Sequence, residues 1–154
     1  MTQPACPLCG AQGVDGLEGC QRLYHAETLR LGLPAYVGPG RVAFDAYCMQ
    51  HPEVYGVSAK SCAAHLTLLC LGVEGEATRA RLDCLRRALN GQPRLVKPEL
   101  PAPLHRGRLT VTHLAGAQSP QEAAVRMTEW AADVWAAYAP LHDTARSLLA
   151  RLLG

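Results

Sequence analysis

The sequence predicts an all-α protein, mainly a helical bundle, with an N-terminal cysteine-rich zinc-knuckle loop and a long proline-rich crossing loop. Three observations support this fold class. Apolar residues recur at helical spacing in several segments, a Cys-x-x-Cys motif lies in a segment without such periodicity, and prolines interrupt residues 92–116. The 154 residues suit one domain. In this domain, we expect residues 1–20 to form a metal-knuckle loop that packs on helices within residues 20–91 and 119–153.

The composition limits the classes of function. A net charge of +2 and a charged fraction of 18% favour neither a nucleic acid nor a membrane surface as partner. Seven cysteines cannot all pair within one chain, and the first residues lack the charged start and apolar run of a signal peptide. We therefore expect reduced thiols and a cytoplasmic protein. The longest apolar stretch, residues 62–73, is shorter than the roughly 20 residues of a membrane span.

The N-terminal loop carries the clearest metal-binding pattern. Cys6 and Cys9 form a Cys-x-x-Cys motif followed by Gly10, a spacing that turns both sulfurs toward one point. A redox pair and plain packing are the alternatives, but no predicted strand precedes the motif as it does in a thioredoxin-like βαβ unit. Cys20 follows after ten further residues and is the third candidate ligand of a zinc ion.

A closed structural zinc site needs a fourth ligand, and two histidines are candidates. His25 lies five residues after Cys20 on a helix predicted over residues 20–31, about 140° around its axis. A shared metal therefore requires that helix to begin after Cys20. His51 ends a helix predicted over residues 38–51, from where its side chain can reach a neighbouring loop. We prefer His51, the alternative being that it only caps its helix.

Two further polar residues lie on the helix that ends at His51. Tyr47 is four residues before His51 and shares its face of the helix. Asp45 is expected either to support a metal ligand by a hydrogen bond or to pair with an arginine, the commoner fate of a helix acid.

The remaining elements follow from capping residues and periodicity. Ser58 and Ser119 are N-cap candidates, and Gly32 with Pro34, Gly91 and Pro140 interrupt helices. The predicted helices span residues 58–72, 74–90 and 119–138, and a last helix follows Pro140. Residues 108–113 alternate in polarity and are the one short strand candidate.

Histidines on two of these helices are alternative ligands. Cys62 and His65 lie side by side at i, i+3 spacing, which would serve a metal or a thiolate nucleophile. A buried histidine with its own hydrogen-bond partner is the interpretation we prefer for His65. His142 lies one residue off the apolar stripe of the last helix.

Several short strings carry a resemblance that spans nearly the whole chain. They are Cys6-Pro7-Leu8-Cys9-Gly10, Cys20, Asp45-Ala46-Tyr47, Gln50-His51-Pro52, Ala64-His65-Leu66, and Trp130 with Val134-Trp135 and His142. Together they resemble an uncharacterised bacterial family of domain-of-unknown-function proteins. The resemblance implies a small helical domain that contains cysteine and histidine and has no assigned activity. It places Cys6, Cys9, Cys20, His51 and His65 at motif positions, which favours His51 as the fourth ligand. Leu141 stands where a second histidine is expected, which argues against a metal site on the last helix.

Two functions from different classes follow. The first is a zinc-binding helical protein with a structural metal and an unidentified small molecule or protein as partner. The second is a metal-dependent hydrolase or thiol transferase of the DinB/YfiT-like helical type, in which His51, His65 and His142 hold an open metal position. A zinc module for nucleic acid is disfavoured, because the charge is near neutral and aromatic residues make up only 5% of the chain.

Overall fold

Eight α-helices and one short 3-10 helix make up the regular structure of the computed structural model, which describes residues 2–32 and 38–154. No strand occurs in these ranges, so the prediction of an all-α protein is confirmed. None of the described helices is both long and apolar enough to cross a membrane. The elements are α1 (Gly16–Leu31), α2 (Gly38–Gln50), α3 (Pro52–Tyr55), α4 (Ala59–Val73), α5 (Arg79–Asn90), α6 (Val111–Ala115), α7 (Pro120–Ala137), η1 (Ala139–Leu141) and α8 (His142–Leu153).

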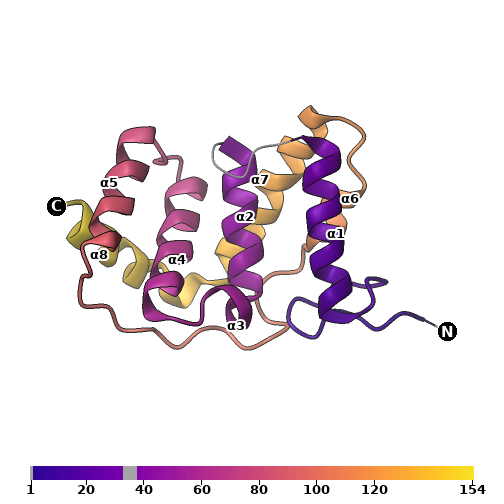
Figure 1. Ribbon diagram of the computed structural model, residues 1–154, viewed down its shortest axis with the longest axis horizontal. Helices are drawn as coiled ribbons and strands as arrows, with labels where there is room; N and C mark the ends of the chain where they lie inside the picture. Colours follow the sequence, from indigo (N-terminus) through magenta and orange to yellow (C-terminus); the bar gives the residue numbers. More distant parts are fainter. Residues whose placement is uncertain (1, 33–37) are drawn as a thin grey trace.

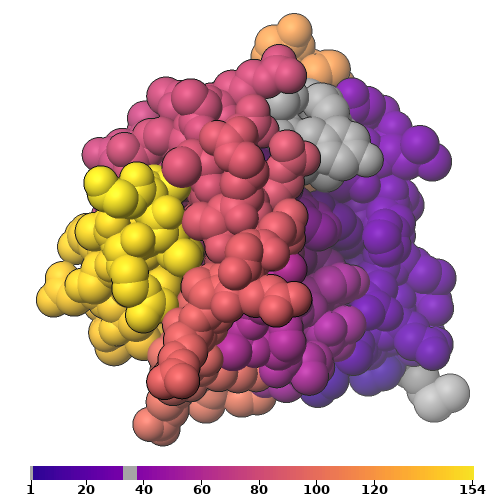
Figure 2. All heavy atoms as spheres, turned by 60° about the vertical axis from the view of Figure 1, so that its left-hand side comes forward, coloured from indigo at the N-terminus to yellow at the C-terminus, as the bar shows by residue number. Residues whose placement is uncertain are grey.

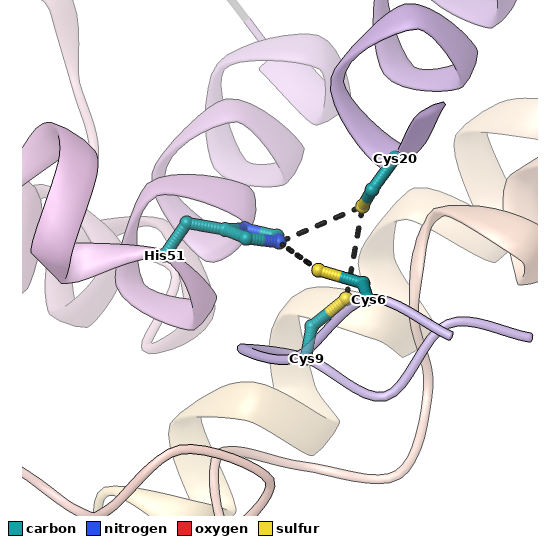
Figure 3. Close-up of side chains that lie close together, drawn as sticks. All are labelled: Cys6, Cys9, Cys20 and His51. Carbon is teal, nitrogen blue, oxygen red and sulfur yellow. Dashed lines mark hydrogen bonds between the residues drawn. The ribbon is translucent and has the colours of Figure 1, made fainter. Parts of the chain in front are cut away.

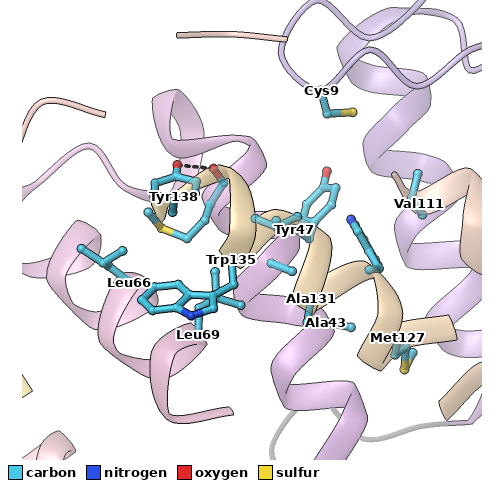
Figure 4. Close-up of a cluster of buried hydrophobic side chains, with 14 of the residues drawn as sticks. Cys9, Ala43, Tyr47, Leu66, Leu69, Val111, Met127, Ala131, Trp135 and Tyr138 are labelled. Carbon is cyan, nitrogen blue, oxygen red and sulfur yellow. Dashed lines mark hydrogen bonds between the residues drawn. The ribbon is translucent and has the colours of Figure 1, made fainter. Parts of the chain in front are cut away.

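Helix α2 is the centre of the bundle. It packs against α7 on one side and α4 on another, and α1, α2, α4 and α5 stand side by side in Figure 1. Every residue of α2 from Asp45 to Gln50 is buried. Ala43 and Tyr47 of α2 lie in one hydrophobic cluster with side chains of α4 and α7, including Leu69 and Trp135 (Figure 4). This close packing fixes the position of the last turn of α2, which ends beside His51.

The predicted N-caps are confirmed, whereas two predicted helix starts are wrong. The hydroxyls of Ser58 and Ser119 accept hydrogen bonds from the first turns of α4 and α7. Helix α5 begins at Arg79 and not at residue 74, because Gly75 has a φ of 78° that breaks the helical path. Helix α1 begins at Gly16 and not at Cys20. Pro34, the predicted helix stop after Gly32, lies outside the described residues.

The early start of α1 depends on a glycine within its first turn. A Cβ added at Gly19 would lie 1.3 Å from the carbonyl oxygen of Val14, so any larger residue would displace the loop that precedes the helix. The glycines at positions 16 and 19 weaken the helical pattern of the sequence. They permit the tight turn into the helix, which is why the sequence places the start too late.

The predicted strand at residues 108–113 is wrong. Its second half forms α6, with the Thr110 hydroxyl accepting the amide of Thr112 as N-cap. Its first half is held by the Asp133 carboxylate, which accepts the amides of Arg108 and Leu109 at 2.6 and 2.8 Å. A side chain of α7 therefore supplies the hydrogen bonds that a partner strand would supply.

The crossing loop, residues 91–110, has no regular structure and runs along one end of the bundle from α5 to α6 (Figure 1). Arg106 anchors it: this buried guanidinium forms an ion pair with Glu53 and donates to the carbonyls of Pro101 and Gln50. The Gln50 amide in turn donates to the carbonyls of Arg106 and Leu109. The loop is thereby fixed to the end of α2.

Candidate metal centre

The N-terminal loop is folded into a knuckle by its own backbone. The amide of Cys6 donates to the carbonyl of Ala11, and the amide of Gly10 donates to the carbonyl of Cys6, both at 2.9 Å. Gly10 has a φ of 82°, in the left-handed region that favours glycine. The resulting turn brings the sulfurs of Cys6 and Cys9 next to each other, on the side that faces Cys20 and His51 (Figure 3).

Two helix ends bring the other two side chains to the knuckle. Cys20 lies in the second turn of α1 and is completely buried. His51 follows the last residue of α2 and precedes Pro52, the first residue of α3. Proline suits that first position because its missing amide hydrogen has no partner there. The chain turns sharply at His51, and its imidazole projects from the end of α2 toward the cysteines (Figure 3).

The four candidate ligand atoms, the sulfurs of Cys6, Cys9 and Cys20 and a ring nitrogen of His51, lie within 4.8 Å of one another. The Nε2 of His51 is 3.6 Å from the sulfurs of both Cys6 and Cys20, and the Cys9 and Cys20 sulfurs are 3.7 Å apart. A tetrahedral zinc ion with ordinary bond lengths has sulfur–sulfur edges of about 3.8 Å and sulfur–nitrogen edges of about 3.6 Å. These three separations match the edges of a tetrahedral site.

The orientation of the His51 ring is fixed from its other nitrogen. Its Nδ1 donates to the carbonyl of Tyr47 at 2.7 Å, one turn earlier in α2. This bond turns Nε2 toward the sulfurs, as in many metal sites where a hydrogen bond from the other ring nitrogen orients the imidazole. The ring also lies 4.3 Å from that of Tyr47, which itself stacks on Tyr24 at 4.1 Å. His51 thus binds a helix carbonyl, as in the capping alternative, while presenting Nε2 to the cysteines.

Mutual hydrogen bonds shift the pKa values of these groups. The bond with Cys20 lowers the pKa of Cys9 to about 4. Burial opposes ionisation of Cys6, but its bond with His51 lowers the pKa of that thiol. Burial also disfavours the charged form of His51, but bonds to Cys6 and Cys9 outweigh burial and raise its pKa to about 9. Thiolates and neutral imidazole are the forms that bind metal ions. Cys20, whose pKa is raised by its bond to Cys9, and His51, whose pKa is also raised, must therefore each release a proton to bind one.

The other predicted ligands lie elsewhere. His25 is exposed on α1. His65 donates from Nδ1 to Asp45 at 2.9 Å, and His142 donates from Nε2 to the carbonyl of Trp135 at 2.7 Å while its ring stacks on that indole. Asp45 pairs with Arg41 and His65, so its arginine partnership, the second of the two predicted roles, is confirmed.

The predicted metal site of His51, His65 and His142 is not assembled. Within residues 2–32 and 38–154, the only group of three or more cysteine, histidine and acidic side chains close enough to share an ion is the Cys3His group. Each of the other two histidines has a structural partner, as described above. The preferred interpretation of His65 as a histidine with its own hydrogen-bond partner is confirmed.

Sequence reasoning missed the residue beside His51. Gln50 is completely buried, and its Oε1 accepts the indole N–H of Trp130 at 3.0 Å while its amide holds the crossing loop. The available signal was a polar amide within an apolar helix, next to a candidate ligand. The arginine that completes this network, Arg106, lies in a segment without periodicity, so no sequence pattern indicated its partner.

Comparison with known sequences gives a match over most of the chain. Residues 4–139 match the family of unknown function DUF5946. The chain belongs to this family. The predicted resemblance to a domain-of-unknown-function family is therefore confirmed, and the matched range includes all four members of the Cys3His group but not His142. No curated protein and no solved structure matches the chain.

Proposed function

We propose that the protein binds one zinc ion through Cys6, Cys9, Cys20 and His51, and that the ion is structural. The observation that carries this proposal is the convergence of four buried donor atoms from three separate segments of the chain. Three thiols and one imidazole are a common donor set of structural zinc sites. Thiolate ligands need a reducing compartment, so the proposal includes a cytoplasmic location.

The closed donor set argues for a structural role. Catalytic zinc sites keep one position for water or substrate, whereas four protein ligands fill a tetrahedral ion. Cys6, Cys20 and His51 are completely buried and Cys9 is only 7% exposed, so a substrate has no direct approach. No observation favours a hydrolase or thiol transferase built on His51, His65 and His142.

The ion would join the knuckle to the bundle. Residues 2–15 contain no helix, and few of their side chains are buried besides the two cysteines. Structural zinc contributes about 10 to 16 kcal/mol in small zinc-finger peptides, far more than such a loop gains from packing. A single ion would therefore order the knuckle and fix it to α1 and to the end of α2. We infer that all of these segments belong to one domain.

Metal analysis of untagged protein tests the proposal. Wild-type protein should contain about one zinc per chain, and Cys20→Ala and His51→Ala should lose it. His65→Ala and His25→Ala are matched controls that should keep it, because neither side chain belongs to the Cys3His group. Zinc that persists without Cys20 and His51, or that disappears with His65, would refute the assignment. Equal protease resistance of the knuckle with and without chelator would refute the structural role.

A further inference from the structure

A second candidate site lies between α4 and α5, on the face that Figure 2 shows with α5 standing forward. We propose that this cleft binds a small molecule with an anionic group, a carboxylate or a phosphate, and an apolar body, and that Arg41 binds the anionic group. None of its residues belongs to the Cys3His group, so the proposal does not depend on zinc.

The cleft has the size and lining of a small-molecule site. Its volume is about 420 Å³, within the range of roughly 300 to 1,000 Å³ that is usual for ligand pockets. Half of its ten lining residues are aliphatic, and the other half are polar or charged. The lining residues are Arg41, Lys60, Ala64, Leu68, Leu82, Asp83, Leu85, Arg86, Leu89 and Asn90.

Positive charge is concentrated around this cleft. Arg41, Lys60 and Arg86 line it, against a single acid, Asp83. Lys60 is held by the side-chain oxygen of Asn90 at 3.0 Å, and Arg86 is 3.5 Å from Asp83. Arg41 pairs with Asp45 and Arg86 with Asp83, while Lys60 bonds a neutral amide oxygen, so these groups carry an excess of one positive charge, which favours an anion.

Arg41 is held in a binding orientation. Its Nε donates to Asp45 at 3.1 Å, and Asp45 is completely buried. The other oxygen of that carboxylate accepts Nδ1 of His65 at 2.9 Å. Burial raises the pKa of Asp45, while the bonds to His65 and Arg41 oppose that rise. The Arg41 guanidinium also lies 6.0 Å from the centre of the Phe44 ring.

The terminal nitrogens of Arg41 are the groups that would bind the ligand. Among the described residues, hydrogen bonding of the Arg41 side chain is confined to Nε, and the side chain is 26% exposed. A guanidinium with two adjacent N–H groups available binds carboxylate or phosphate in a bidentate manner. Because Asp45 already fixes the side chain, binding loses little conformational entropy.

The apolar body of the ligand has a surface on which to lie. Leu82, Leu85 and Leu89 of α5 face Ala64 and Leu68 of α4 across the cleft. A second hollow of about 400 Å³ adjoins the first and shares Arg41, Leu68 and Leu82 with it. Arg41 thus stands where the two hollows meet, beside aliphatic lining on both sides.

Calorimetric titration of full-length, zinc-loaded protein with octanoate and octyl phosphate tests the proposal. Octanol and octylamine are controls that keep the apolar chain but lack the negative charge. Octanoate or octyl phosphate should bind at one site, at least about tenfold more tightly than octanol, because a charged bidentate hydrogen bond is lost with the alcohol. Which of the two anions binds more tightly distinguishes a carboxylate ligand from a phosphate ligand. Equal binding of octanol, or no saturable binding of either anion, would refute the proposal.

Variants locate the site. Ala64→Phe should abolish binding by filling the cleft, and Arg41→Lys should weaken it about tenfold while keeping a charge beside Asp45. Lys60→Ala with Arg86→Ala changes only exposed side chains, so a several-fold loss there cannot come from misfolding. Arg22→Gln, an exposed arginine of α1, should bind like wild type. Unchanged binding in the Lys60 and Arg86 double variant and in Arg41→Lys would refute the assignment.

Discussion

Two buried tyrosines, Tyr47 and Tyr138, differ in whether the hydroxyl has a partner. The hydroxyl of Tyr138 donates to the carbonyl of Met49 (Figure 4). The hydroxyl of Tyr47, on α2 close to the cysteines, is buried and has no hydrogen-bond partner among the residues that the structure describes. Burial raises the pKa of both phenols, so both hydroxyls stay protonated at neutral pH. Replacing each tyrosine by phenylalanine removes one oxygen and should therefore have opposite effects.

The expected magnitudes follow from the hydrogen bonds. A buried polar group without a partner destabilises a protein by about 1 to 3 kcal/mol, whereas a satisfied bond contributes about 1 kcal/mol. Tyr47→Phe should therefore leave the free energy of unfolding unchanged or raise it by about 1 kcal/mol. Tyr138→Phe should lower that free energy by about 1 to 2 kcal/mol, because the buried carbonyl of Met49 loses its donor. For a chain of this size the difference corresponds to several degrees in Tm.

Urea unfolding of both variants and of wild type at one zinc concentration gives the comparison. Far-ultraviolet circular dichroism should follow the unfolding, with equal m values in the three proteins. If Tyr47→Phe loses 1 kcal/mol or more, the hydroxyl has a stabilising partner and the reasoning is wrong. If Tyr138→Phe is as stable as wild type, the bond to Met49 contributes nothing.

Three further predictions concern the loops and the first helix. Burial favours the protonated form of Glu53, but its bonds with Arg106 outweigh burial and lower its pKa. The ion pair therefore stabilises the fold fully at pH values above the ordinary glutamate pKa of about 4.5. This stabilisation is lost as the pH falls through the lowered pKa of Glu53. In an acid titration of unfolding free energy, Glu53→Gln should not show this loss. Gly19→Ala should destabilise the protein by more than about 3 kcal/mol, because the added Cβ would overlap the Val14 carbonyl. It should also weaken zinc binding at Cys20. Unfolding measures the first effect, and competition with a chromophoric chelator measures the second. Removal of zinc by a chelator should make residues 2–15 sensitive to protease while the helical circular dichroism persists. If the helical circular dichroism disappears together with the protease resistance, the ion does not have a local role.

The sequence supported the fold class and the members of the Cys3His group for identifiable reasons. Helical periodicity and the caps at Ser58 and Ser119 are local signals, and both are confirmed. The spacing of Cys6 and Cys9 is also local, and metal-ligand chemistry limited the remaining candidates to few residues. The structure brings together the four side chains that were predicted as ligands. Their binding of zinc stays a prediction.

What the sequence did not supply depends on contacts between distant segments. The partnership of Arg106 with Glu53 joins residues 53 positions apart, and no periodicity indicates it. Residues 108–113 resemble a strand because polarity alternates there, but a carboxylate of α7 satisfies their amides instead. At the start of α1 the sequence hid a helix, because the tight turn there requires glycines, which are poor helix formers. Contacts between distant segments thus decided the first two cases, and a local turn decided the third.

The end of α2 links the cysteine cluster to an indole. Gln50 accepts the N–H of Trp130, and the next residue, His51, faces the three sulfurs. Any shift of His51 on metal exchange therefore moves the dipole beside a completely buried tryptophan. The second tryptophan, Trp135, stacks on His142. The protein thus contains its own optical reporter: the emission of Trp130 should follow occupancy of the cysteine cluster in real time, without an added dye.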